Sequence, residues 1–131
     1  MLKSLFSRWH VKFGVISTAE NGGDYVSKET RIISKSENVR YGLIFWNKGI
    51  ESFEGSIVNY LPSKPETINP VYLGKSNMTP RGFSLQREPE THIQGAVRII
   101  KIETGDPLGK YEVDIIVNGK TIKTIKYQVI E

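Results

Sequence analysis

The stretch YEVDIIVNGKTIKTIKYQVI (residues 111–130) decides the fold class. Apolar side chains alternate with polar ones on both sides of Asn118-Gly119. An Asn-Gly pair between two alternating runs is the strongest short-range signal for a β-hairpin, because both central residues of a type I′ turn need a positive φ. The segment therefore predicts two antiparallel strands joined by a tight turn.

Upstream of this hairpin the chain divides into short runs of β character, separated by turn residues. We expect strands at residues 11–16, 30–33, 40–46, 55–61 and 96–102. Residues 62–89 hold five of the six prolines, so we expect a long loop or crossover there, with short strands at 71–73 and 82–85. Many short strands without a convincing interior helix predict an all-β antiparallel sandwich. A small closed barrel is the alternative.

The composition fits one globular domain. The chain has 131 residues, of which 38% are hydrophobic and 24% charged, and it has no cysteine. Disulfide frameworks, cysteine metal sites and thiol nucleophiles are therefore excluded. We expect residues 11–131 to form a single domain, preceded by a separate segment at residues 1–10. Because no apolar run is long enough for a membrane span or a secretory leader, we expect a cytoplasmic protein.

Residues 1–10 carry an amphipathic helical pattern. Leu2, Leu5, Phe6 and Trp9 recur at the spacing of one helix face. A helix of about two turns is marginal in water unless it docks on something. One interpretation is a lid over one end of the protein's own core. The other is a surface for a partner protein or a membrane, so these four residues are the candidate partner-binding residues.

Lysines recur along the last predicted strand, at Lys120, Lys123 and Lys126, in a chain with a formal charge of +4. Lysines on a terminal strand discourage edge-to-edge aggregation. They are also the candidate residues for binding a polyanion, together with the basic N-terminal residues. Simple alternation places Lys120 and Lys126 on one face and Lys123 on the other, unless a bulge intervenes.

The sequence offers little for catalysis. Its histidines are His10 and His92, and it has no nucleophile elbow, phosphate-binding loop or His-Glu-x-x-His motif. The nearby carboxylate pairs Glu51/Glu54 and Glu88/Glu90 are interpreted as solvated surface. We therefore expect no catalytic residues, no cofactor and no metal. An enzyme whose site has no sequence signature is a third hypothesis.

The run Asp106-Pro-Leu-Gly-Lys-Tyr111, followed by the terminal hairpin, resembles the same region of many immunoglobulin-like sandwiches. The resemblance implies that Tyr111 is structural, with its hydroxyl bonded to upstream backbone. Together with Lys12-Phe-Gly-Val15, Thr30-Arg-Ile-Ile33 and Arg40-Tyr-Gly-Leu43, this order is similar to an uncharacterised bacterial family of single immunoglobulin-like domains, a domain of unknown function. The cysteine pair of antibody domains is absent.

These observations predict an antiparallel immunoglobulin-like β-sandwich that acts as a non-enzymatic binding or accessory module. Protein–protein interaction, through an exposed sheet edge or through residues 2–9, is the leading hypothesis. The alternative is weak electrostatic binding of nucleic acid or an anionic membrane through the lysine clusters, with affinity that falls steeply with salt.

Overall fold

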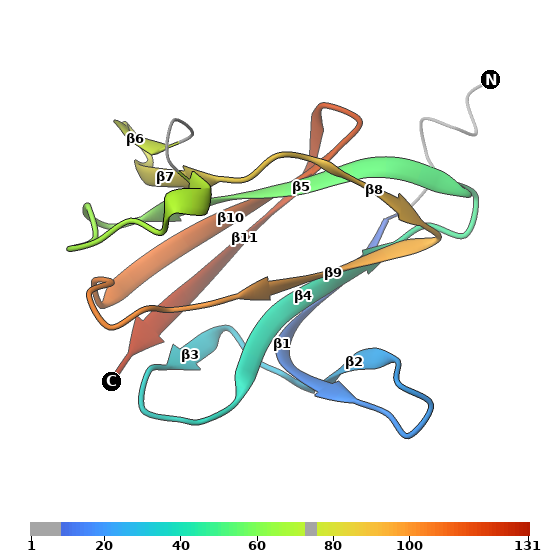
Figure 1. Ribbon diagram of the computed structural model, residues 1–131, viewed down its shortest axis with the longest axis horizontal. Helices are drawn as coiled ribbons and strands as arrows, with labels where there is room; N and C mark the ends of the chain where they lie inside the picture. The colour runs from blue at the N-terminus through green and yellow to red at the C-terminus, as the bar shows by residue number, and fades with distance from the viewer. Residues whose placement is uncertain (1–8, 73–75) are drawn as a thin grey trace.

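Two β-sheets face each other across a shared core (Figure 1). The computed structural model describes residues 9–72 and 76–131. Their elements are β1 (His10–Thr18), β2 (Asp24–Glu29), β3 (Ile32–Ser34), β4 (Arg40–Trp46), β5 (Ser52–Leu61), the 3-10 turn η1 (Pro70–Tyr72), β6 (Ser76–Thr79), β7 (Gly82–Gln86), β8 (Glu90–Ile93), β9 (Gly95–Ile100), β10 (Gly109–Val117) and β11 (Lys120–Ile130). Within these ranges no helix has the length and apolar character that crossing a membrane requires.

The smaller sheet has the strand order β2-β1-β4-β9, and the larger sheet has the order β3-β11-β10-β5-β7-β6, with β8 also paired to β5. Neighbouring strands are antiparallel, apart from the parallel pair β3–β11. This arrangement confirms the expected antiparallel sandwich and not the closed barrel. The terminal hairpin is β10–β11, as predicted.

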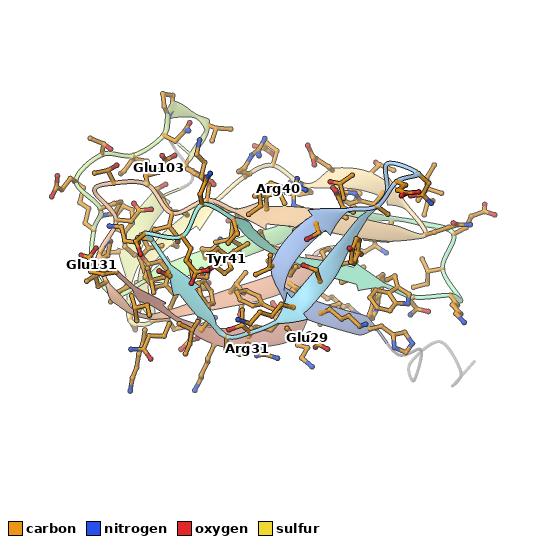
Figure 2. The ribbon with its side chains drawn as sticks, turned by 90° about the horizontal axis from the view of Figure 1, so that it is seen from below. Glu29, Arg31, Arg40, Tyr41, Glu103 and Glu131 are labelled. Atoms are coloured by element: carbon orange, nitrogen blue, oxygen red, sulfur yellow. The ribbon has the colours of Figure 1, made fainter. Side chains whose placement is uncertain are left out.

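Several elements differ from the sequence-based expectation. β2 lies where only a turn and a connection were expected, and its side chains are nearly all exposed, so it lacks the alternation that marks a strand. The expected strand at 71–73 is wrong, because Pro70–Tyr72 forms a 3-10 turn. β6 was not expected either. Figure 2 shows Glu29 at the end of β2 and Arg31 on the short connection to β3.

The core lies between the two inner sheet faces. β4 contributes Leu43 and Phe45, and β10 contributes Val113 and Ile115, all of them fully buried. Because side chains alternate along a strand, β4, β10 and β11 commit every second residue of their central parts to this cluster. A slip of one residue in register would turn a whole row toward solvent, so the core fixes the register.

The hairpin turn has the predicted geometry. Asn118 and Gly119 have φ values of 49° and 82°, the positive region that a type I′ turn needs. Asn118 also ties the turn to β5, because its backbone N–H donates to the Glu54 carbonyl (2.8 Å) and its Oδ1 accepts from the Glu54 N–H (2.9 Å).

Tyr111 occupies the corner that the immunoglobulin-like resemblance implies. Its hydroxyl donates to the backbone carbonyl of Pro107 (2.7 Å), four residues upstream. Its ring packs against Tyr127 with centroids 5.4 Å apart. The hydroxyl therefore pins the connection before β10 while the ring fills the core.

We predict that Tyr111→Phe lowers the free energy of unfolding by about 1 kcal/mol, because it removes one buried hydrogen bond and keeps the ring. Urea unfolding would show a lower midpoint with an unchanged slope. Tyr25→Phe is the matched control, since Tyr25 is 48% exposed and should tolerate the change. Equal midpoints for the two variants would contradict a structural role for the Tyr111 hydroxyl.

Candidate functional site

The chain crosses from the larger sheet to the smaller one between β8 and β9. β8 pairs with β5, whereas β9 pairs with β4. Gln94 makes the corner with a φ of 69°, and its N–H donates to the Glu51 carbonyl (2.8 Å). After this corner β9 runs in the direction opposite to β8 (Figure 1).

A groove of about 410 Å³ lies between β9 and the strands β5 and β7 of the other sheet. Its floor includes Ile57, Asn59 and Leu61 from β5 and Leu85 from β7. Residues 97–102, six consecutive positions of β9 and the segment that follows it, form one wall. Residues 67–69, Val71 and Tyr72 also line the groove. Its volume is typical of a ligand pocket.

Tyrosine hydroxyls and one carboxyl group lie deep in this groove. The Tyr127 hydroxyl donates to Asn59 Oδ1 (2.6 Å). Burial raises the pKa of Tyr72, Tyr111 and Tyr127 further above the usual tyrosine value. Burial also raises the pKa of Asp106, whose Oδ2 accepts the Glu103 N–H (2.7 Å). The deep polar groups therefore serve mainly to bond the groove's own walls.

One side of β9 has no partner strand within residues 9–72 and 76–131. A Cβ on Gly42 of β4 would lie 2.4 Å from the Arg98 carbonyl oxygen, so the Arg98 backbone faces β4. Main-chain groups of successive residues in a strand point to opposite sides. The N–H and C=O groups of Val97 and Ile99 therefore face the groove. Among residues 9–72 and 76–131, the strand hydrogen-bonded to β9 is β4 alone.

The solvent-facing side chains of β9 are apolar. Natural edge strands are usually blunted by charges, prolines or short length. β2 carries Asp24, Lys28 and Glu29, and β11 carries its lysines where β3 does not cover it. On β9 the solvent-facing residues are Val97 and Ile99, which are 36% and 43% exposed. The solvent-facing side of β9 is therefore apolar where β2 and β11 carry charges, and its one charged side chain, Arg98, points inward.

The candidate partner-binding residues fall partly outside the described chain. Leu2, Leu5 and Phe6 lie outside it, so their role stays a prediction. Trp9 is partly buried, with its ring 4.9 Å from Phe53 and 6.1 Å from Phe45. Its indole thus contacts the protein's own core.

The structure spreads the three candidate polyanion-binding lysines over both faces of the sheet. All three are exposed. Lys126 pairs with Glu112, whereas Lys123 and Lys120 pair with the buried residues Ile115 and Val117. A bulge between Lys123 and Thr121 shifts the register. Lys120 and Lys123 therefore share a face, and Lys126 takes the other, which corrects the simple alternation.

An ion-pair network holds the β6–β7 hairpin to β10 beside Lys126. The Arg81 guanidinium donates two hydrogen bonds to the Asp114 carboxylate (2.7 and 2.8 Å) and two to Glu112 Oε1 (2.7 and 3.3 Å). It also lies 4.1 Å from the ring centroid of Tyr60. Burial alone would raise the pKa of Asp114, but hydrogen bonds from Arg81 and Thr124 outweigh it and hold this pKa below 3.8.

We predict that Asp114→Asn destabilises the protein by roughly 1.5–3 kcal/mol at neutral pH, because it removes charge-assisted hydrogen bonds from a buried position. The folded-state pKa is lowered, so the stabilisation is fully present above the unfolded-state pKa of 3.8. It disappears as the pH falls through the lower folded-state value. Urea unfolding at several pH values would measure the difference from wild type.

Glu37→Gln is the control for that experiment, since Glu37 is exposed. This change should alter stability by less than about 0.5 kcal/mol at any pH. An Asp114→Asn protein as stable as wild type at pH 7 would contradict the role assigned to the network.

Both histidines pack against aromatic rings. His10 stacks on Trp46 with centroids 5.2 Å apart, and His92 lies 5.5 Å from Phe53. Burial lowers the pKa of His92. Glu90, which belongs to one of the carboxylate pairs in the sequence, accepts a hydrogen bond from Arg98. In the part of the chain that the structure describes, no three metal-ligating side chains gather as a metal site.

The residues around the groove were not singled out by the sequence reasoning. Residues 96–102 read as one buried strand, and the arginine within that apolar run was the available signal of a special environment. The free edge was not detectable, because it depends on which distant strands pair with one another.

These features define an immunoglobulin-like β-sandwich with a groove beside its edge strand β9. The chain belongs to the PM0630 beta sandwich domain family, whose model matches residues 11–130. It is similar in fold to an immunoglobulin-like protein from Pseudomonas aeruginosa, with 12% sequence identity and a TM-score of 0.55, over 92% of this chain and 91% of that chain.

A second solved structure gives a weaker match. It is the Pseudomonas fluorescens alkylpurine DNA glycosylase AlkC bound to DNA containing an abasic site analog. The sequence identity is 11% and the TM-score 0.38, over 99% of this chain and 36% of that chain. No curated protein matches the chain. The immunoglobulin-like likeness shows the fold and leaves the activity to be argued from the site.

Proposed function

We propose that this domain is a non-catalytic module that binds an extended segment of another protein along the free edge of β9. The observation that carries the proposal is the groove wall made by residues 97–102, on the side of β9 that has no partner strand within the described chain. An added strand would pair with the main-chain groups of Val97 and Ile99, as in other cases of β-strand addition.

Two features of the groove support this kind of binding: free main-chain groups on β9 and an apolar floor. Main-chain hydrogen bonds to β9 would give affinity with little dependence on the partner's sequence. Alternate side chains of the added strand would point between the sheets toward Ile57, Leu61 and Leu85. Burial of apolar area there contributes about 25 cal/mol per Å² before the cost of ordering the segment.

We predict that Ile99→Pro weakens binding, because proline removes the Ile99 N–H from the free edge and leaves the main-chain groups of Arg98 that face β4. The probes are peptides selected from a random phage-displayed library against the wild-type domain and then synthesised. Loss of one main-chain hydrogen bond corresponds to about a fivefold rise in Kd. Fluorescence anisotropy of labelled peptides would measure it.

Ile99→Thr is the matched control, because threonine is β-branched like isoleucine and keeps the N–H. Circular dichroism and urea unfolding would check that both variants fold. If Ile99→Pro does not fold, peptides methylated on alternate backbone nitrogens replace it, and methylation should abolish binding at one parity only. Selected peptides that are indifferent to both changes, or a library that yields none, would overturn the proposal.

Electrostatic binding is the second candidate function, and one observation favours it. A hollow of about 460 Å³ on the larger sheet is lined by Arg31, Arg81, Lys110 and Lys126, with Glu112 among them. Arg81 is already bound to Asp114 and Glu112 there. Of the three candidate lysines, Lys126 lines this hollow, whereas Lys120 and Lys123 do not.

The electrostatic candidate predicts that a single-stranded oligonucleotide or phosphatidylserine vesicles bind at low salt and dissociate at moderate salt. Lys126→Ala should weaken this binding, whereas Lys48→Ala, at an exposed position outside the hollow, should change it little. Co-sedimentation and anisotropy would measure it. Binding that ignores salt, or that both substitutions weaken equally, would count against a specific site.

A further inference from the structure

Arg98 lies on the inner face of β9, between the buried residues Ala96 and Ile100. It is 8% exposed, and it lines the groove. Its Nη1 donates a hydrogen bond to Glu90 Oε1 on β8. A guanidinium has five N–H donors, and burying a charged group is costly unless acceptors surround it. Within the described residues, Glu90 is the one side chain that accepts from Arg98.

Glu90 satisfies this cation incompletely. Its side chain is 54% exposed, so it approaches the guanidinium from the rim of the groove. Arg98 is also among the residues that line the groove, where a bound segment would lie. A second carboxylate there would accept hydrogen bonds from donors that Glu90 does not use, in a site poorly screened by solvent.

The charges around the groove favour an acidic guest near Arg98. Arg87 and Lys101 line the groove along with Arg98. The acidic lining residues, Glu103 and Asp106, belong to the loop after β9, and Asp106 is tied to the Glu103 backbone N–H (2.7 Å). Figure 2 shows Glu103 at the end of the molecule where Glu131 also lies. Arg98 is therefore the charged lining residue that belongs to β9 itself, and the acidic lining residues lie beyond the end of this strand.

We infer that the segment bound along β9 carries an Asp or Glu side chain opposite Arg98, flanked two positions away on each side by apolar residues. This inference rests on the proposed strand addition. Residues opposite one another on adjacent strands point to the same face, so the partner of Arg98 points into the groove. The partners of Ala96 and Ile100 point the same way and meet the apolar floor.

The test pans one random phage-displayed peptide library against three forms of the full chain: wild type, Arg98→Glu/Glu90→Arg and Glu90→Gln. The double variant keeps the pair and reverses its polarity. Wild type should enrich peptides in which Asp or Glu lies between apolar residues at alternate positions, and the double variant should enrich Lys or Arg there. For a selected peptide, acid-to-amide substitution should raise the Kd for wild type about tenfold.

Glu90→Gln keeps the buried arginine and removes its competitor, so it should bind the same acidic peptide several-fold more tightly than wild type. It also covers the case in which the double variant does not fold. Peptides that need the Ile99 N–H but show no acid preference, or the same preference in every form, would overturn this inference and leave strand addition standing. Peptides that do not need the Ile99 N–H would overturn the strand addition itself.

Discussion

The inward rows of β4 and β10 hold the two sheets together. Leu43 and Phe45 from one row and Val113 and Ile115 from the other are fully buried in a single cluster. Alternation commits these residues to the core, so the register of their neighbours in both sheets is fixed as well. Within the described residues, β9 is the last strand on one side of the smaller sheet. The groove lies beside this strand.

The groove is a consequence of how the chain changes sheets. The corner at Gln94 carries the chain out of its pairing with β5 and into its pairing with β4. After the corner, β9 faces β5 and β7 across the space between the sheets instead of bonding to them. The hydrogen bond between Tyr127 and Asn59 joins two strands of the larger sheet within the groove. Val97 and Ile99, whose main-chain groups point away from β4, line the groove as well.

Local patterns predicted the parts of the fold that local physics controls. The Asn118-Gly119 turn needs two positive φ values that few residue pairs tolerate, so the hairpin was predictable, and resemblance supplied the Tyr111 corner. β2 was not predicted, because its side chains are exposed on both faces and show no alternation of apolar and polar residues. The groove was not predicted, because it lies beside a sheet edge. Which strand forms an edge depends on pairing between distant segments, and the sequence of a single strand does not show that pairing.

The most direct test of the account is amide hydrogen exchange along β9, resolved by residue with NMR in the free domain and then with a selected peptide bound. The backbone N–H groups of Arg98 and Ile100 should exchange slowly in both states, because they face β4. Those of Val97 and Ile99 should exchange quickly in the free domain and slowly in the complex. Slow exchange at Val97 and Ile99 without peptide, or fast exchange with it, would contradict a free binding edge.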